Sequence, residues 1–199
     1  MTDVTDNSAA VVLERPEPHI AVLRLSRPPR NVMSPALMDG FRDALAAVRA
    51  DTSIRALVVT GSGEHFCAGA DLGTGELPGV PQALGGAPGT AERLQAVYAP
   101  FLELVDLDIP SVAAVNGAAV GGGFGLACAC DFRVVTPESR FKAPFATLGI
   151  HPGMALTHLL LFAPAGTGAG GAAVRITPGS DLRRIARTLA DAGVIANPL

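Results

Sequence analysis

The sequence predicts an α/β fold in which a mostly parallel sheet is covered by helices. Three observations predict it. Strand-like apolar segments alternate along the chain with helix-like segments, an order typical of parallel sheets. The strand segments are rich in Val, Ile and Ala, as expected where both faces of a sheet are covered. Two of them end in glycine-rich turns, at 66–72 and 116–131.

The first part of the predicted core is a strand, a helix and a second strand. Residues 19–27 and 55–61 have the apolar pattern of strands. Between them, Ser34 and Pro35 match a helix start, with serine as the N-cap and proline at the first helical position. One face of this helix is expected to be buried because four apolar residues recur at helical spacing, namely Leu37, Phe41, Leu45 and Val48.

The second part repeats this alternation. Residues 73–89 are rich in Gly and Pro and predict a mobile loop. Residues 90–106 predict a helix whose buried face carries Leu94, Val97, Phe101 and Val105. The remaining expected elements are strands at 111–115, 131–136 and 140–142, a short buried helix at 121–128, and a helix at 153–162.

Three segments are expected along the chain. Residues 1–18 form a disordered or extended tail, because the first ten residues are acidic and polar. Residues 19–162 form the core, and residues 163–199 form a linker and a final helix at 181–192. Gly166, Gly168 and Gly171 match a dinucleotide-binding pattern, but no strand precedes them, which favours a flexible linker.

Composition excludes several classes of protein. The chain has 199 residues, 49% hydrophobic and 17% charged, which is typical of a globular domain. A net charge of −3 argues against nucleic-acid binding through phosphate contacts. The first residues lack the basic and apolar regions of a secretory signal, so we expect a cytoplasmic protein. Residues 111–130 carry no charge but are rich in Gly and Ala, which favours a buried strand, turn and helix over a membrane span.

The three cysteines, Cys67, Cys128 and Cys130, predict neither disulfides nor a metal site. Their number is odd, and reduced thiols are usual in the cytoplasm. A C-x-C pair without further ligands at metal-binding spacing is weak evidence for a metal, so we expect small buried hydrophobic residues and no metal.

The two glycine-rich turns are the candidate functional site. A strand that breaks into small residues exposes its backbone N–H groups, and two such turns side by side can direct two donors at one ligand oxygen. Such an oxyanion hole polarises a carbonyl or a thioester. The simpler alternative is that both segments are only tight turns that allow close helix packing.

In this order and context, the two turns resemble the crotonase superfamily, the enoyl-CoA hydratase/isomerase family. The resemblance covers residues 19–161 and includes A-G-A-D-L at 68–72 and N-G-x-x-x-G-G-G at 116–123. Asp131 and Pro144 also stand where the family has Asp and Pro, and L-G-I-H-P-G at 148–153 matches a further family turn. The resemblance implies a crotonase-like fold of repeated β-β-α units.

The resemblance also implies a ligand and its binding residues. Family members bind acyl-CoA thioesters in an oxyanion hole of two backbone amides, which map to Ala70 and Gly122. Coenzyme A belongs to the substrate, and no other cofactor is implied. Residues implied to contact the substrate are Ala70, Asp71, Leu72, Gly73, Gly122, Gly125 and Phe145. Arg27 and Arg30 lie in the turn after the first strand, where they either meet CoA phosphates or form a solvated basic turn.

The chain departs from the family at two catalytic positions. Family hydratases place a water with two glutamates, and the corresponding positions here are Gly125 and Phe145. A positioned acid or base contributes about 10²–10⁴ in rate, and neither residue can transfer a proton. We expect Phe145 to make the acyl pocket more apolar and Gly125 to leave space beside the thioester. Hydration of crotonyl-CoA is therefore expected to be negligible.

Another residue could supply the missing acid or base. His151, in a turn close to the family's active site, is the first choice. Other polar residues near the two turns are Glu64, His65, Asp71, Glu76 and Tyr98. For each of these, a surface position, or a packed ring in the case of Tyr98, is the simpler interpretation.

The C-terminal segment is the second departure. Family members usually continue for several dozen more residues, in helices that complete the CoA site and a trimer interface, and residues 163–199 match that region poorly. We therefore expect a weakened homotrimer and an incomplete CoA site. Three hypotheses remain: an enzyme of the family with weak or non-standard catalysis, a non-catalytic acyl-CoA-binding protein, and a truncated remnant.

Overall fold

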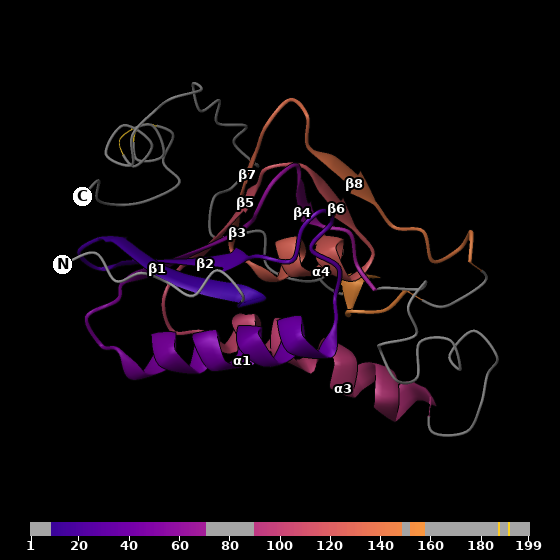
Figure 1. Ribbon diagram of the computed structural model, residues 1–199, viewed down its shortest axis with the longest axis horizontal. Coiled ribbons are helices and arrows are strands. Elements are labelled where there is room, and N and C mark those ends of the chain that lie inside the picture. The colour runs from indigo at the N-terminus through magenta and orange to yellow at the C-terminus, as the bar shows by residue number, and fades with distance from the viewer. Residues whose placement is uncertain (1–8, 71–89, 149–151, 158–186, 188–190, 192–199) are drawn as a thin grey trace. The chain divides into compact units, whose positions relative to one another are not determined.

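The computed structural model describes residues 9–70, 90–148, 152–157, 187 and 191. The chain divides into two compact units, Met1–Phe162 and Ala163–Leu199. The described helices and strands of the first unit, shown in Figure 1, form an α/β fold whose sheets are mostly parallel. No helix among the described residues is long and apolar enough to cross a membrane.

Five strands form the larger sheet, in the order β1-β2-β3-β5-β7. β1 (Val11–Glu17) pairs antiparallel with β2 (Ile20–Leu25), and β2 pairs parallel with β3 (Ala56–Gly61). The parallel register continues through β5 (Ser111–Val115) to β7 (Phe132–Val135).

Three short strands form a second, parallel sheet in the order β4-β6-β8. They are β4 (His65–Cys67), β6 (Ala118–Val120) and β8 (Arg140–Lys142). Each of them directly follows a strand of the larger sheet, so the β-β unit is repeated three times along the chain. The expectation of repeated β-β-α units with mostly parallel pairing is confirmed.

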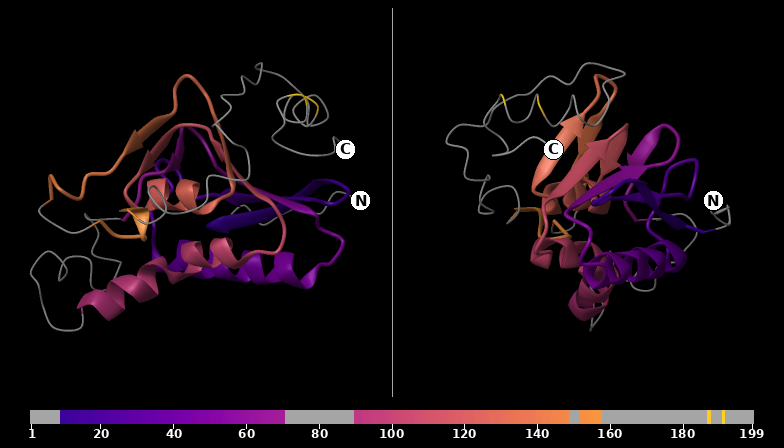
Figure 2. Two further views of the ribbon diagram at one scale, coloured as in Figure 1. Left: turned by 180° about the vertical axis from the view of Figure 1, so that it is seen from behind. Right: turned by 90° about the vertical axis from the view of Figure 1, so that its left-hand side faces the viewer.

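Helix α1 covers one face of the larger sheet at β1 and β2 (Figure 2), and α3 packs against α1. In α1 (Pro35–Ala50), the Ser34 side chain accepts a hydrogen bond from Leu37 N and proline occupies the first turn, as predicted. The four predicted core residues of α1 are buried. Phe41 meets Phe101 of α3 (Thr90–Leu102) edge to face, with ring centroids 4.8 Å apart.

The third described helix, α4 (Gly122–Ala129), packs against β4, β5 and β6. Nearly all of its residues are buried, so it lacks the polar face of a surface helix. Asp131, two residues after the helix, accepts hydrogen bonds from the backbone N–H and the hydroxyl of Ser111, both at 2.8 Å. The end of α4 is thereby fixed to the start of β5.

The structure differs from the sequence prediction at three places. β1 lies inside the segment 1–18 expected as a disordered or extended tail; it is extended, but it is paired in the sheet. Val105 was expected on the buried face of a helix and is instead 56% exposed, because the chain tightens into a 3₁₀ helix, η1 (Glu103–Asp106), and the helical spacing changes. The helix expected from Gly153 does not begin there, since Met154 and Ala155 have φ of 59° and 47°.

Some predicted elements lie outside the described residues. They are the loop at 73–89, most of the helix at 153–162, the glycine pattern at 166–171, and the final helix at 181–192 except for residues 187 and 191, which are helical.

Candidate functional site

The first glycine-rich turn leaves β4 and is held from one side. Ala68 N donates to Arg30 O at 3.0 Å, and Met33 N donates to Gly69 O at 2.9 Å. Because a peptide unit is planar and trans, the N–H of Ala70 points opposite to the carbonyl of Gly69. The Ala70 amide is therefore directed away from Met33.

The second turn joins β6 to α4. Gly121 is the N-cap, with φ 54° and ψ −115°, a conformation that favours glycine. Its N–H donates to Lys142 O at 2.9 Å, and its carbonyl accepts from Gly125 N at 3.0 Å. Gly122 is the first helical residue, and first-turn amides have no partner within their own helix. The helix dipole adds partial positive charge at this end.

The two turns touch through backbone atoms. A Cβ on Gly69 would lie 2.5 Å from Val120 O and 3.4 Å from Gly122 N. A Cβ on Gly123 would overlap Cys67 O. Side chains are excluded from the junction, so glycine is required on both turns. The sequence prediction that the two turns lie side by side is confirmed.

An apolar side chain and a tyrosine ring lie against α4 at this junction. A Cβ on Gly122 would lie 2.5 Å from Met33 Sδ and 3.1 Å from Tyr98 Cε1. Met33 is fully buried and Tyr98 is 8% exposed. The sequence analysis did not single out Met33, because an apolar residue before a helix carries no signal of what it touches.

Gly125 does not leave an open space, contrary to the sequence-based expectation. A Cβ at this position would overlap the Met154 side chain, which is 2% exposed. Met154 occupies the volume because the chain turns back at 154–155, where both residues have positive φ. The Met154 side chain therefore lies against α4, through its Cβ and Cγ, at the position where the family resemblance places a carboxylate.

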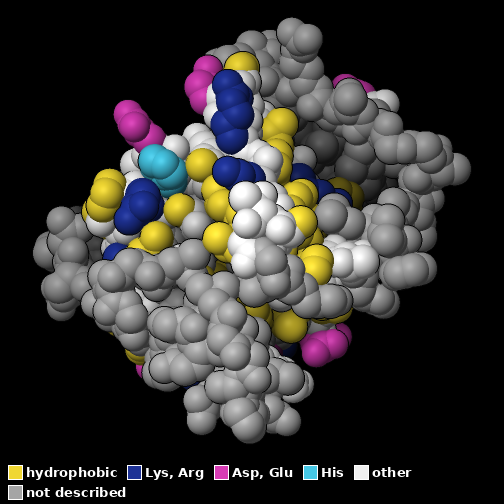
Figure 3. Space-filling model, turned by 90° about the vertical axis from the view of Figure 1, so that its right-hand side faces the viewer, with side chains coloured by type: hydrophobic (Ala, Val, Ile, Leu, Met, Phe, Trp, Pro, Cys, Tyr) yellow, Lys and Arg dark blue, Asp and Glu magenta, His cyan; other side chains and the backbone are white. Residues whose placement is uncertain are grey.

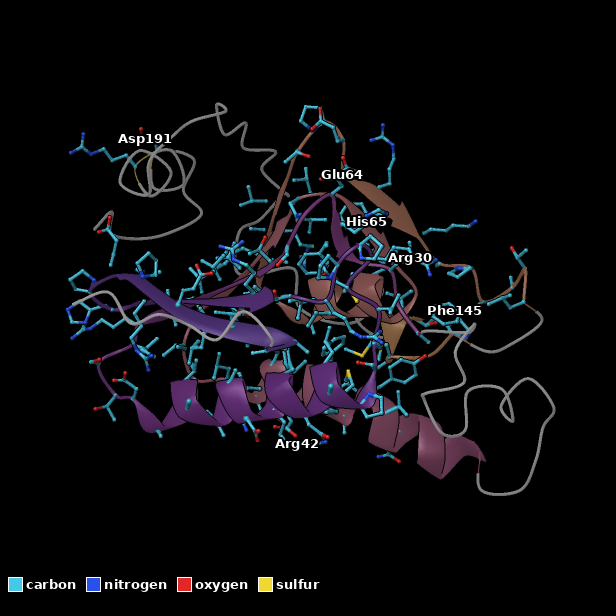
Figure 4. The ribbon with its side chains drawn as sticks, in the orientation of Figure 1. Arg30, Arg42, Glu64, His65, Phe145 and Asp191 are labelled. Carbon is cyan, nitrogen blue, oxygen red and sulfur yellow. The ribbon has the colours of Figure 1, made fainter. Side chains whose placement is uncertain are left out.

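Phe145 lies at the start of α4. Its Cζ would be 4.0 Å from a Cβ on Gly121, and the residue is 5% exposed. It packs with Cys128 and Leu156. Figure 4 shows Phe145 on the same side of the molecule as Arg30, Glu64 and His65, whereas Arg42 lies on the outer side of α1. Phe145, Cys128 and Leu156 thus make the surroundings of the second turn apolar.

Several predicted site residues lie outside the described residues, namely Asp71, Leu72, Gly73, Glu76 and His151. Of the other candidates, Glu64 is exposed and His65 is partly buried. His65 Nδ1 is enclosed and has no hydrogen-bond partner among the residues that the structure describes.

Arg27 and Arg30 border a cavity of about 250 Å³ beside the first turn, together with Pro28, Pro29 and Val32. Figure 3 shows basic side chains and a histidine beside hydrophobic side chains on the face that contains β8.

Burial controls the titration of the groups near the junction. It raises the pKa of the Tyr98 phenol and raises the pKa of the Cys67 and Cys130 thiols to about 12. These groups are protonated at neutral pH, so the tyrosine is a donor rather than a base. All three cysteines are free, and the described residues contain no cluster of His, Cys, Asp or Glu able to hold a metal ion.

Comparisons with known proteins identify relatives of most of the chain. A family model described as Enoyl-CoA hydratase/isomerase matches residues 15–165. "Probable enoyl-CoA hydratase EchA14" of Mycobacterium tuberculosis is 38% identical over 152 residues, which cover 75% of this chain and 56% of the relative. The peroxisomal bifunctional enzyme of Cavia porcellus is 35% identical over 147 residues, 72% of this chain and 18% of that protein.

Solved structures share the fold. A probable enoyl-CoA hydratase/isomerase from Mycobacterium abscessus has a TM-score of 0.64 and 34% identity, covering 76% of this chain and 56% of that chain. Pseudomonas aeruginosa DspI has a TM-score of 0.66 and 30% identity, covering 80% of this chain and 58% of that chain. The present chain thus spans just over half the length of EchA14 and of these two solved chains.

Proposed function

This chain belongs to the enoyl-CoA hydratase/isomerase family, and from that membership we propose that it binds an acyl-CoA thioester at the junction of its two glycine-rich turns. The thioester oxygen lies between the amides of Ala70 and Gly122. The observation that carries the proposal is the close approach of the two turns, with Gly122 N 3.4 Å from where a Cβ on Gly69 would lie.

The rest of the ligand extends over neighbouring segments. The acyl chain lies against Phe145, and the CoA portion follows 70–73. Its phosphates meet Arg27 and Arg30, whose cavity lies beside the first turn. The apolar surroundings favour medium or long acyl chains. Copies of the chain form a weak homotrimer at most, because residues 163–199 match the family poorly.

Catalysis, where it occurs, does not use two carboxylates. Gly125 and Phe145 stand at the positions that the resemblance assigns to glutamates, and the Met154 side chain fills the space beside Gly125. Two backbone donors can stabilise an enolate, and a non-standard group, with His151 as the first candidate, moves the proton. The same observation favours a second candidate function, a protein that holds acyl-CoA without turnover.

The first test measures binding and turnover together. Acetyl-, butyryl-, octanoyl- and palmitoyl-CoA are titrated by calorimetry, and crotonyl-CoA hydration is followed by the loss of its enoyl thioester absorbance. We expect binding of the longer esters and no measurable hydration. Hydration at ordinary hydratase rates would contradict the inference that the missing carboxylate pair abolishes hydration. Absence of binding by every ester would reject the proposed function.

A second test addresses the amides themselves, which side-chain substitution cannot remove. Replacing Ala70 by lactic acid exchanges its N–H for an ester oxygen and leaves the methyl group in place. Loss of one neutral donor is expected to weaken ester binding several-fold, on the order of 1 kcal/mol. The matched control is lactic acid at Ala36, an exposed residue in the first turn of α1, which should leave binding unchanged.

A further inference from the structure

Tyr98 is held in a fixed position between two glycines that are far apart in the sequence. Its Cε1 would lie 3.1 Å from a Cβ on Gly122. Its Cε2, Cζ and hydroxyl oxygen would lie 2.7, 3.0 and 3.0 Å from a Cβ on Gly153. A side chain at either glycine would push the ring away. Packing against Gly122 and Gly153 therefore fixes the orientation of the Tyr98 ring.

The Tyr98 hydroxyl is available to a ligand. Tyrosine hydroxyls in buried positions usually find a hydrogen-bond partner. Here the residue is 8% exposed, yet no described residue makes a hydrogen bond with its hydroxyl. Among the described residues, His65 Nδ1 is the polar side-chain atom that is both fully enclosed and without a hydrogen-bond partner. The Tyr98 hydroxyl also has no partner among these residues but is not fully enclosed, so it retains access to solvent.

The other side chains that contact the start of α4 are apolar. Met33 contacts Gly122, Phe145 contacts Gly121, and Met154 contacts Gly125. Among these described groups, the phenol is the side-chain donor that a ligand oxygen meets. The ring edge faces Gly122 through Cε1, which is bonded to the carbon that carries the hydroxyl. The hydroxyl therefore lies close to that contact and directly beside Gly153.

We propose that Tyr98 recognises a second oxygen of the ligand, carried on the acyl chain near the thioester. This assignment rests on the proposed acyl-CoA function and narrows its substrate class to thioesters with a carbonyl or hydroxyl oxygen on the acyl chain. The thioester oxygen takes the backbone amides, and the second oxygen accepts a hydrogen bond from the phenol. A plain hydrocarbon chain leaves the phenol without a partner, at a cost in affinity.

The experiment compares two esters that differ at one carbon. Butyryl-CoA and 3-oxobutyryl-CoA are titrated by calorimetry against the full chain and its Tyr98→Phe variant. We expect the wild-type chain to bind the 3-oxo ester about five- to tenfold more tightly, as one neutral hydrogen bond allows. The variant should lose this preference, and it should bind butyryl-CoA at least as tightly as the wild type does, because it has no phenol to leave without a partner. Gln95→Ala, at an exposed position of the same helix, is the matched control and should keep the preference.

A second readout needs no variant. Tyr98 is the single tyrosine of the chain, so labelling tyrosine with carbon-13 at Cζ gives one resonance. The resonance should move with 3-oxobutyryl-CoA and much less with butyryl-CoA, because a hydrogen bond to the hydroxyl changes the shielding of Cζ. A merely structural tyrosine would respond equally to both esters.

The outcomes separate this assignment from the proposed function. Equal wild-type affinity for the two esters, or an equal loss for both in Tyr98→Phe, overturns the role of Tyr98 and leaves acyl-CoA binding in place. Absence of binding by either ester overturns the role of Tyr98 when octanoyl-CoA still binds, and it overturns the proposed function as well when no acyl-CoA binds.

Discussion

A glycine in α4 determines what can lie beside the second turn. Gly125 has no side chain, yet the space next to it is filled by Met154 rather than open. The sequence alone predicted the missing carboxylate at 125 but not the methionine side chain that fills its place, because the contact joins a helix to a turn almost thirty residues later. A carboxylate restored at 125 would therefore need a shorter residue at 154 as well.

The first prediction tests this packing. Gly125→Ala should lower the free energy of unfolding by about 1–3 kcal/mol, the usual cost of overpacking a core. The control is Gly40→Ala in α1, where the new Cβ would make ordinary contact with Val11 at 3.4 Å. That change should be neutral or stabilise by about 0.4–1 kcal/mol, as glycine-to-alanine changes do at compatible positions. Urea unfolding measures both, and equal effects would show that Met154 does not fill the space tightly.

At the scale of elements, the antiparallel β1–β2 pair is fastened by an ion pair. Arg24 Nε lies 2.7 Å from Glu14 Oε1, and the side chains are diagonal neighbours in the register. The hydrogen bond from Arg24 lowers the pKa of Glu14. A lowered folded-state pKa means that the stabilisation is present above the unfolded-state pKa and is lost as the pH falls through the folded-state value.

The second prediction follows from that sign. Glu14→Gln should reduce the free energy of unfolding at neutral pH by about 0.2–1 kcal/mol, since the pair is partly exposed and screened. The difference between wild type and variant should disappear in acid, where Glu14 is protonated. Thermal unfolding over a pH series measures it. A difference that persists below the range of carboxylate titration would assign the effect to something other than charge.

Strand length and neighbours explain which elements the sequence could predict. The strands at 20–25, 56–61 and 111–115 have apolar runs long enough to recognise, and the start of α1 has a serine cap followed by proline. β4 and β6 have three residues each and overlap the two glycine-rich segments, where the sequence predicts turns rather than strands. β1 contains Pro16 and several charges, which are tolerated because it is an edge strand.

At the scale of the whole core, two asparagines join the two sheets. Asn31 is fully buried, and its Nδ2 donates to Ser62 O at 2.9 Å and to His65 O at 2.8 Å. Asn116 accepts from Gly61 N at 3.1 Å and donates to Gly63 O at 2.8 Å. Both side chains form hydrogen bonds with backbone groups of the segment that connects β3 of the larger sheet to β4 of the smaller one.

The third prediction concerns this joint. In Asn31→Asp, a carboxylate replaces the donating amide and faces carbonyl oxygens, so the free energy of unfolding should fall by about 3 kcal/mol or more at neutral pH. The buried carboxyl should have a raised pKa, so part of the stability should return as the pH falls and the carboxyl protonates. Asn116→Asp, at a less buried position, is the comparison and should lose less. A loss independent of pH would contradict the electrostatic cause.

The Asn116–Gly117 pair also makes the connection between the two sheets susceptible to deamidation. Glycine is required there because a Cβ on Gly117 would overlap Glu64 O, yet asparagine followed by glycine is the dipeptide most prone to losing its side-chain amide. Deamidation requires the backbone nitrogen of Gly117 to attack the side-chain amide carbon of Asn116, and the hydrogen bonds to Gly61 and Gly63 hold that amide in place. Unfolding breaks these hydrogen bonds. Stored protein should therefore accumulate aspartate and isoaspartate at 116, visible by mass spectrometry, in proportion to the time it spends unfolded.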